Sequence, residues 1–321
     1  MNLTERFPKS PSLPAKLGQP ESKAEDDGSS KYGKYKRSAS SWDLISIQKL
    51  PDFLNDNEYL LNNHRPELNS AVECLKSVFK LHTETWNIWT HAVGSIGSLI
   101  LSVYYLRYVA EDWQHRLSFS IFFFGAVFCM GASAIYHAFI CHSERVCKFL
   151  AKIDYCGVII LIMTSYIPWL HFAFYCQRYV KLSYMVLVTV LGLACISVVV
   201  RDEFREPCYR WLRLGLFAFM ALVGLIPATH YLISDEVFHI YGIPMLWLAS
   251  MAILYLTGGL AYGSCIPERL CPGKFDIWCQ SHQILHVCVI GGVLTCFQGA
   301  ANLASAQLLA DPDCITVNFS Q

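Results

Sequence analysis

Long apolar stretches free of Asp, Glu, Lys and Arg alternate with short charged segments between residues 85 and 309. The hydrocarbon core of a bilayer is about 30 Å thick, so a helix that spans it needs roughly 20 apolar residues. Seven stretches meet this requirement: Thr85–Leu106, Leu117–Cys141, Tyr155–Gln177, Leu182–Val200, Leu214–Ser234, Phe238–Pro267 and Ile277–Leu309. The pattern therefore predicts an all-α integral membrane protein, a seven-transmembrane helix bundle over residues 85–309.

The remaining parts of the chain carry different patterns. Residues 1–41 are rich in Ser, Lys, Gly and Pro and are predicted to be a disordered cytosolic tail. Residues 42–84 hold apolar side chains at mixed spacing and are predicted to be a helical segment at the cytosolic membrane interface. Two forms fit this segment equally: short amphipathic helices lying on the membrane, and a small cap packed on the helix ends. Residues 310–321 are predicted to be an extracellular tail.

The distribution of Lys and Arg predicts the orientation, because short cytosolic loops carry an excess of these residues. With the N-terminus inside, the inner loops hold nine of them and the outer loops hold four. The inner set is Arg145, Lys148, Lys152, Arg201, Arg205, Arg210, Arg213, Arg269 and Lys274, and the outer set is Arg107, Arg116, Arg178 and Lys181. This asymmetry favours a cytosolic N-terminus and an extracellular C-terminus.

The composition agrees with a membrane protein and excludes some partners. Hydrophobic residues make up 54% of the chain and charged residues 16%, against about 25% charged residues in soluble domains. The formal net charge is zero, so no basic field points to a nucleic-acid partner. The 14 cysteines fall mostly in apolar stretches without a Cys-x-x-Cys pair, so we expect most of them to be buried free thiols.

A small set of ionisable residues carries the candidate chemistry. His282 and His286 are four residues apart, so on a helix their rings share one face, as metal chelation requires. His137 ends the predicted second span and Asp154 opens the third, both at the cytosolic end. Three imidazoles and a carboxylate from three helices can therefore meet there. His91, in the inner half of the first span, is the main rival ligand.

Three histidines with an open fourth position are typical of a catalytic zinc site. Zinc in such a site lowers the pKa of a bound water to about 7. We therefore predict that His137, His282 and His286 hold Zn²⁺. Asp154 is the candidate to hold that water or take its proton. Ser133, four residues before His137 and on the same helical face, is the candidate to hydrogen-bond a substrate oxygen.

Several short motifs resemble those of the progestin and adipoQ receptor family, which includes the adiponectin receptors. They are LPDFLNDNEY (50–59), HTET (82–85), NIWTH (87–91), YH (136–137), CHSE (141–144), KIDY (152–155), IPER (266–269), PGKFDIW (272–278) and SHQILH (281–286). The similarity extends from about residue 42 to residue 304. Trp86 departs from the family's usual glycine.

The resemblance implies a seven-helix receptor of the plasma membrane that regulates lipid and fatty-acid metabolism. It implies zinc held by the residues that match His137, His282 and His286, with Asp154 reaching the metal through water. It also implies a ceramidase activity, which releases fatty acid and sphingosine from ceramide. The implied partners are membrane lipids, an extracellular adiponectin-like protein hormone and a cytosolic signalling adaptor bound through the N-terminal segment.

Two other hypotheses remain open at this point. In the first, the protein is a signalling receptor whose zinc is purely structural and clamps the second, third and seventh helices together. In the second, it is a membrane-lipid sensor or transporter with an apolar binding cavity. Transporters often contain broken helices, and the break signals within the predicted spans are Pro168, Pro227 and Pro244, which are common in membrane helices.

Overall fold

A computed structural model of the chain describes residues 42–233 and 242–310. These residues fold into helices joined by loops, with one isolated antiparallel bridge between Ile45 and His64. The all-helical architecture confirms the predicted fold class at this level. The described part of the chain excludes the predicted disordered tail, residues 1–41. It also excludes all but the first residue of the predicted extracellular tail, residues 310–321.

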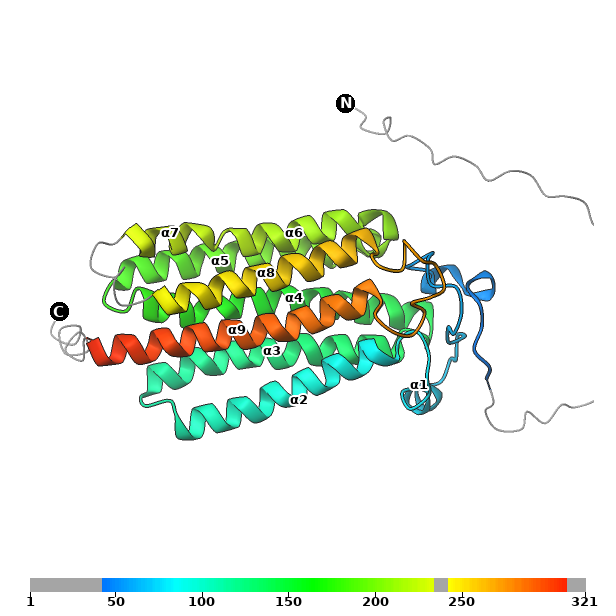
Figure 1. The fold of residues 1–321 in the computed structure, drawn as a ribbon, viewed down its shortest axis with the longest axis horizontal. Coiled ribbons are helices and arrows are strands. Elements are labelled where there is room, and N and C mark those ends of the chain that lie inside the picture. Colours follow the sequence, from blue (N-terminus) through cyan, green and yellow to red (C-terminus); the bar gives the residue numbers. More distant parts are fainter. Residues whose placement is uncertain (1–41, 234–241, 311–321) are drawn as a thin grey trace, which may run out of the picture. The chain divides into compact units, whose positions relative to one another are not determined.

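Among the described residues, helices α2 to α9 run side by side as a bundle (Figure 1). Their bounds are α2 Thr85–Tyr108, α3 Trp113–Phe139, α4 Glu144–Ala173, α5 Arg178–Val199, α6 Arg210–Leu222, α7 Leu225–Ile233, α8 Gly242–Ser264 and α9 Ser281–Ala310. Helices α6 and α7 follow one another along one line (Figure 1). At the break between them, the Tyr166 hydroxyl of α4 donates a hydrogen bond to the Met220 carbonyl oxygen at 2.9 Å.

Five helical segments are long and apolar enough to cross a membrane, judged by length and composition. They are Trp113–Phe139, Arg178–Val199, Pro207–Ile233, Pro244–Ser264 and Ser281–Leu309. Helices α2 and α4 are outside this set. Helix α4 begins at Glu144, eleven residues before the predicted start at Tyr155. A window free of charges cannot contain the first turns of α4, which carry Glu144, Lys148, Lys152 and Asp154.

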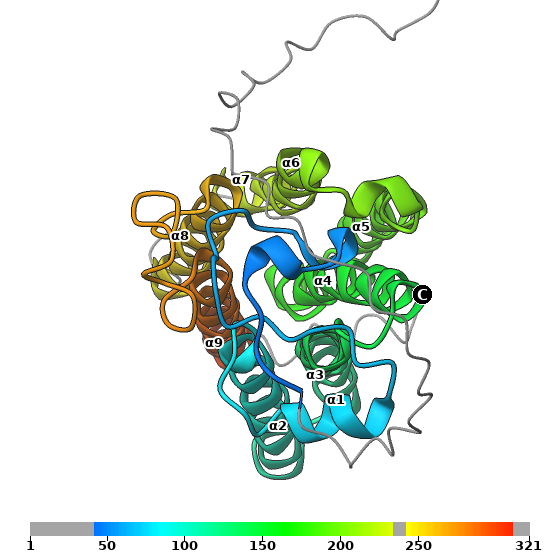
Figure 2. The ribbon, with the colours of Figure 1, turned by 90° about the vertical axis from the view of Figure 1, so that its right-hand side faces the viewer.

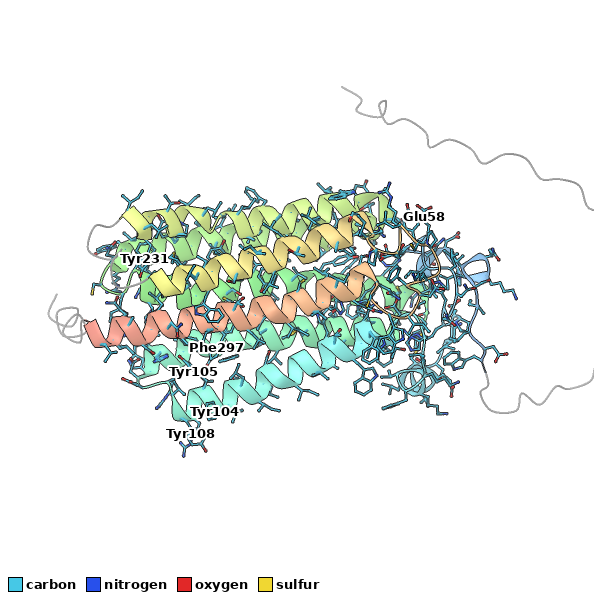
Figure 3. The ribbon with its side chains drawn as sticks, in the orientation of Figure 1. Glu58, Tyr104, Tyr105, Tyr108, Tyr231 and Phe297 are labelled. Carbon is cyan, nitrogen blue, oxygen red and sulfur yellow. The ribbon has the colours of Figure 1, made fainter. Side chains whose placement is uncertain are left out.

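Helix α3 is the most deeply buried of the candidate membrane spans. Its Phe119 and Phe122 are fully buried and share one apolar cluster with Leu170 of α4 and Leu303 of α9. In the same cluster, Tyr105 of α2 meets Phe297 of α9 edge to face, with ring centroids 4.9 Å apart (Figure 3). The buried apolar surface therefore runs between α2, α3, α4 and α9, the helices that carry the candidate site.

Residues 42–84, which we call the cap, lie across one end of the bundle (Figure 2). The cap contains the short 3₁₀ helices η1 (Ile47–Lys49) and η2 (Asp52–Leu54) and the helix α1 (Ala71–Ser77). Helix α1 begins with a Ser70 N-cap, whose hydroxyl accepts a hydrogen bond from the Glu73 backbone N–H at 3.4 Å. The cap therefore covers the helix ends at which α3 finishes and α4 and α9 begin.

The loop between α8 and α9, residues 265–280, holds the cap in place. The carboxylate of Asp276 accepts hydrogen bonds from the backbone N–H groups of Leu61 at 2.9 Å and Asn62 at 2.8 Å. From the same loop, the Gly273 backbone N–H donates to the Tyr59 carbonyl oxygen at 3.0 Å. These bonds join segments more than 200 residues apart in the sequence.

A second buried carboxylate links the cap to the start of α9. Glu268 is fully buried and accepts hydrogen bonds from the Asn57 side-chain amide at 2.9 Å and the Ser281 backbone N–H at 2.8 Å. The Ser281 hydroxyl also donates to it. Because an acidic group at a helix N-terminus satisfies otherwise unpaired N–H groups, Glu268 fixes the first residue of the helix that carries His282 and His286.

Helices α3 and α4 approach closely at Gly125. A Cβ atom at this position would lie 1.9 Å from Oγ1 and 2.9 Å from Cβ of Thr164 on α4. The Thr164 hydroxyl is bonded to the Ile160 carbonyl oxygen at 2.8 Å. Rotation of this side chain leaves its Cβ in place, so the clash can be relieved only when the two helices separate.

We expect Gly125→Ala to lower the free energy of unfolding by about 1–3 kcal/mol, the usual cost of overpacking a tight contact. Thermal unfolding of the purified protein in detergent micelles would measure the change. Gly97→Ala in α2 is the matched control, because no atom lies within 4 Å of its added Cβ. That variant should be neutral or stabilised by up to about 1 kcal/mol. Equal unfolding temperatures for the two variants would contradict the expectation.

Candidate metal centre

Three histidines from two helices meet at the capped end of the bundle. Helix α3 supplies His137 in its last turn, and α9 supplies His282 and His286 in its first two turns. One ring nitrogen from each lies within 4.8 Å of the others. In the part of the chain that the structure describes, this is the one cluster of His, Cys, Asp or Glu with such geometry. The ring centroids are 4.8–5.1 Å apart.

The hydrogen bonds of the rings leave nitrogens available for a metal. His137 Nδ1 lies 2.6 Å from a carboxylate oxygen of Glu84. An ionised carboxylate only accepts, so Nδ1 carries the proton and Nε2 has a free lone pair. That Nε2 atom is buried and has no hydrogen-bond partner. His286 Nδ1 lies 3.2 Å from the Asn87 carbonyl oxygen, which likewise orients its ring. Buried imidazoles held by such partners are the usual arrangement at metal sites, so the donor set fits a divalent metal.

His91 is close to this cluster but is not part of it. Its ring stacks on that of His286, with centroids 3.5 Å apart and planes within 7°. Both of its ring nitrogens are buried without a hydrogen-bond partner. His91 therefore packs against the ring of one candidate ligand and does not join the three-histidine group.

The two other predicted site residues lie beside His137. Asp154, in the third turn of α4, is buried and interacts with His137. The side chain of Ser133, one turn before His137 on α3, is also buried and interacts with the Asp154 carboxyl group. The structure therefore brings all five predicted residues to one end of the bundle, three as a convergent set and two as an adjacent polar pair.

A cavity opens onto these groups. Its volume is about 80 Å³, and its walls include His137, Asp154 and His282. The cap closes it with Leu54 and Asn57. A water molecule needs about 10–15 Å³ of such space, so the cavity has room for a metal ion and several waters. A lipid with two long chains does not fit inside it.

Two residues that sequence reasoning did not single out complete the site. Arg65 is buried in the cap, and its guanidinium donates to the His137 carbonyl oxygen at 2.5 Å, the Ala138 carbonyl oxygen at 3.0 Å and the Ser77 hydroxyl at 2.8 Å. Glu84 accepts from both His137 and the Asn87 side-chain amide, the latter at 2.8 Å. Burial alone would raise the pKa of the Glu84 carboxyl, but these hydrogen bonds outweigh it and hold that pKa below its ordinary value.

Comparison with known proteins shows extensive similarity. A family model described as haemolysin-III related matches residues 79–297. Progestin and adipoQ receptor-like protein 1 of Caenorhabditis elegans is 42% identical over 270 residues, which cover 83% of this chain and 62% of the relative. The adiponectin receptor protein of Drosophila melanogaster is 41% identical over 273 residues, 84% of this chain and 62% of the relative. Heptahelical transmembrane protein 1 of Arabidopsis thaliana is 35% identical over 267 residues, 80% of each chain.

Fold and relatives together define a multi-pass integral membrane protein. More specifically, the chain belongs to the haemolysin-III related family, the family of the progestin and adipoQ receptors, with adiponectin receptors among its relatives. The family resemblance inferred from the motifs is thereby confirmed. The chain spans about 62% of the length of the first two relatives named above.

The loop before α2 predicts a pH dependence of stability. His82 is fully buried, and burial together with the nearby Arg65 lowers its pKa to about 3. The unfolded chain binds a proton at His82 near its ordinary pKa of about 6.5, whereas the folded chain does not. Stability from this group is therefore complete above pH 6.5 and is lost as the pH falls from there towards 3, by at most about 1.4 kcal/mol per pH unit.

We expect His82→Gln to flatten the decline in unfolding free energy between pH 7.5 and 5, as measured by denaturant unfolding in detergent. His142→Gln is the control, since His142 is only half-buried and should leave the wild-type slope intact. A His82→Gln slope as steep as that of the wild type would show that another group causes the decline.

Proposed function

We propose that the protein is a seven-helix membrane receptor of the adiponectin-receptor type that also hydrolyses ceramide with zinc. The observation that carries this proposal is the convergence of His137, His282 and His286 within 4.8 Å beside the buried pair Ser133 and Asp154. A purely structural zinc site needs only the three histidine ligands. It does not require the Asp154 carboxyl group and the Ser133 hydroxyl beside them.

The proposed topology has α2 and α4 as the two further spans. They have 24 and 30 residues, and at 1.5 Å per residue both exceed the roughly 30 Å of the hydrocarbon core. Several relatives are named heptahelical transmembrane proteins. We place the capped end in the cytosol, which agrees with the excess of Lys and Arg in the loops at that end.

Cysteine chemistry supports the same orientation. The described cysteines are mostly free and buried, as expected, but Cys176, which follows α4 at the end opposite the cap, is disulfide-bonded. At the capped end, Cys271 and Cys279 are exposed and free. Because disulfides persist in oxidising compartments and exposed thiols in the reducing cytosol, this asymmetry favours a cytosolic cap.

His137, His282 and His286 would hold the zinc through the ring nitrogens that face one another. Zinc bound there supplies a Lewis acid that polarises the amide carbonyl and lowers the pKa of a bound water. Asp154 takes a proton from the water that attacks the carbonyl carbon, and Ser133 donates a hydrogen bond to the carbonyl oxygen. The C–N bond breaks and Asp154 returns the proton to the leaving amine. One fatty acid and one sphingosine result. The cavity cannot contain both lipid chains, so turnover requires the cap or the helices to move apart.

We expect purified wild-type protein loaded with zinc to release sphingosine from ceramide, and the His282→Ala/His286→Ala double variant to lose both the zinc and the release. Asp154→Asn should keep the zinc and slow the release by about 10²–10⁴-fold. His142→Ala is the control for loss of a histidine outside the cluster. Release that persists unchanged in the double variant would place the chemistry elsewhere, and the absence of release from zinc-loaded wild type would leave the receptor with a structural metal.

We expect Glu84→Gln to weaken zinc binding by about 10- to 100-fold, the usual effect of losing the partner that orients a metal-bound imidazole. Competition with a chelator of known affinity would measure this, and the absorption spectrum of the Co²⁺-substituted protein would report any change in the ligand field. Glu67→Gln, at an exposed position in the cap, is the matched control. Equal affinities in the two variants would show that Glu84 does not orient His137.

The structural-zinc alternative draws on one feature of the site. The ligands join α3 to α9, two helices far apart in sequence, so a metal would clamp them. In that case removal of zinc lowers the unfolding temperature while no lipid is turned over. The proposed partners are the same in both cases: an adiponectin-like protein hormone at the extracellular end, and a cytosolic adaptor that binds the N-terminal segment.

A further inference from the structure

Helix α1 has one buried face and one open apolar face. Cys74 and Ser77 are fully buried on the side that packs against the end of α3. On the opposite side Val72 is 59% exposed, Leu75 is 53% exposed and Phe79, just after the helix, is 81% exposed. Contiguous apolar patches of this kind mark an interaction surface.

This open face continues directly into the outward face of α2. The ring of Phe79 meets that of Trp89 edge to face at 5.8 Å, and the Trp89 indole N–H donates to the Val78 carbonyl oxygen at 3.1 Å. Beyond Trp89, the outward residues of α2 recur at helical spacing and are exposed and apolar. They are Val93, Ile96, Ile100 and Val103.

Aromatic residues bound this apolar stripe at both ends. Trp89 lies at the capped end, and Tyr104 and Tyr108 project from α2 at the other end (Figure 3). Trp and Tyr are enriched at the two membrane–water interfaces. From Trp89 to Tyr108 a helix rises by about 28 Å, close to the roughly 30 Å of the hydrocarbon core. The plane of one lipid interface therefore passes through Trp89 and its neighbour Phe79.

The charges around α1 suit the cytosolic leaflet, which carries anionic lipids. Lys76 is 59% exposed and pairs with Glu73 at 2.9 Å. Lys80 is exposed and lies 4.1 Å from the ring centroid of Trp42. Two lysines against one glutamate leave this face with a positive charge at the level where phosphate headgroups begin.

We propose that α1 is an interfacial helix, with Val72, Leu75 and Phe79 inserted at the boundary between headgroups and acyl chains of the cytosolic leaflet. Lys76 and Lys80 contact anionic headgroups. The choice of leaflet rests on the orientation given under the proposed function, whereas the contact with lipid does not. Through Ser77, Arg65 and the His137 carbonyl oxygen, this contact sets the depth of the candidate metal centre relative to the headgroups, where the amide of a ceramide lies.

The test uses the full-length protein in nanodiscs of phosphatidylcholine and phosphatidylserine in equal amounts. Phe79 is replaced by the photo-crosslinking residue p-benzoylphenylalanine, and mass spectrometry identifies the adducts after illumination. We expect lipid adducts at this position as abundant as those from the same replacement of Ile96. The same replacement of Glu67, which lies in the cap, should give few. Absence of lipid adducts at position 79 while position 96 reacts would overturn the proposal, as would a protein adduct in their place in native membranes.

The headgroup contact has its own readout. Serine lipids should be enriched over choline lipids among the adducts at position 79, by about fivefold if one lysine acts at full strength. Lys76→Gln/Lys80→Gln should remove this enrichment, and Lys49→Gln, elsewhere in the cap, should not. No enrichment in the wild type would overturn the anionic contact. Adduct formation needs neither zinc nor turnover, so it distinguishes failure of this inference from failure of the proposed hydrolase, and His282→Ala/His286→Ala should crosslink as the wild type does.

Discussion

The geometry of the capped end depends on the side chain of Arg65. The last carbonyl groups of a helix have no partner within that helix, and at the end of α3 the Arg65 guanidinium satisfies those of His137 and Ala138. The same group holds Ser77 of α1. A buried cation with several acceptors is costly to release, so one side chain joins the cap, the interfacial helix and the first candidate ligand into a single unit.

The two halves of the candidate metal centre are positioned by different means. His137 is held from the cap side, through Arg65 on its backbone and Glu84 on its ring. His282 and His286 are held from the loop side, where Glu268 fixes the first residue of α9. The hydrogen bonds of Asp276 then join this loop to the cap. Rings on separate helices can converge because their supports are bonded to each other rather than only to the bundle.

Much of this arrangement follows from local sequence rules, and the rest depends on long-range contacts. Charge-free stretches predicted the helices, but they placed the start of α4 too late because its first turns carry Glu144 and Lys148. The spacing of His282 and His286, with the direction of each span, was enough to bring the site residues to one end. Sequence spacing could not decide whether His91 is a ligand. Only the packing of α2 against α9 shows that its ring stacks on that of His286. The roles of Arg65 and Glu84 could not be predicted from the sequence, because their bonds to the end of α3 join residues 53 to 73 positions apart.

The bonds between the cap and the α8–α9 loop also constrain the order in which the protein is made. The cap leaves the ribosome more than 200 residues before its partners Glu268 and Asp276. Until then Leu61, Asn62 and Asn57 have no partners from that loop, and His137 faces an incomplete ligand set. The cap therefore cannot complete its bonds while the earlier helices are being made, and the candidate metal centre can be completed only after α9 has been synthesised. A chain truncated before α9 would expose a cap that lacks its bonded partners. Cellular quality control could recognise such a chain by this exposed segment.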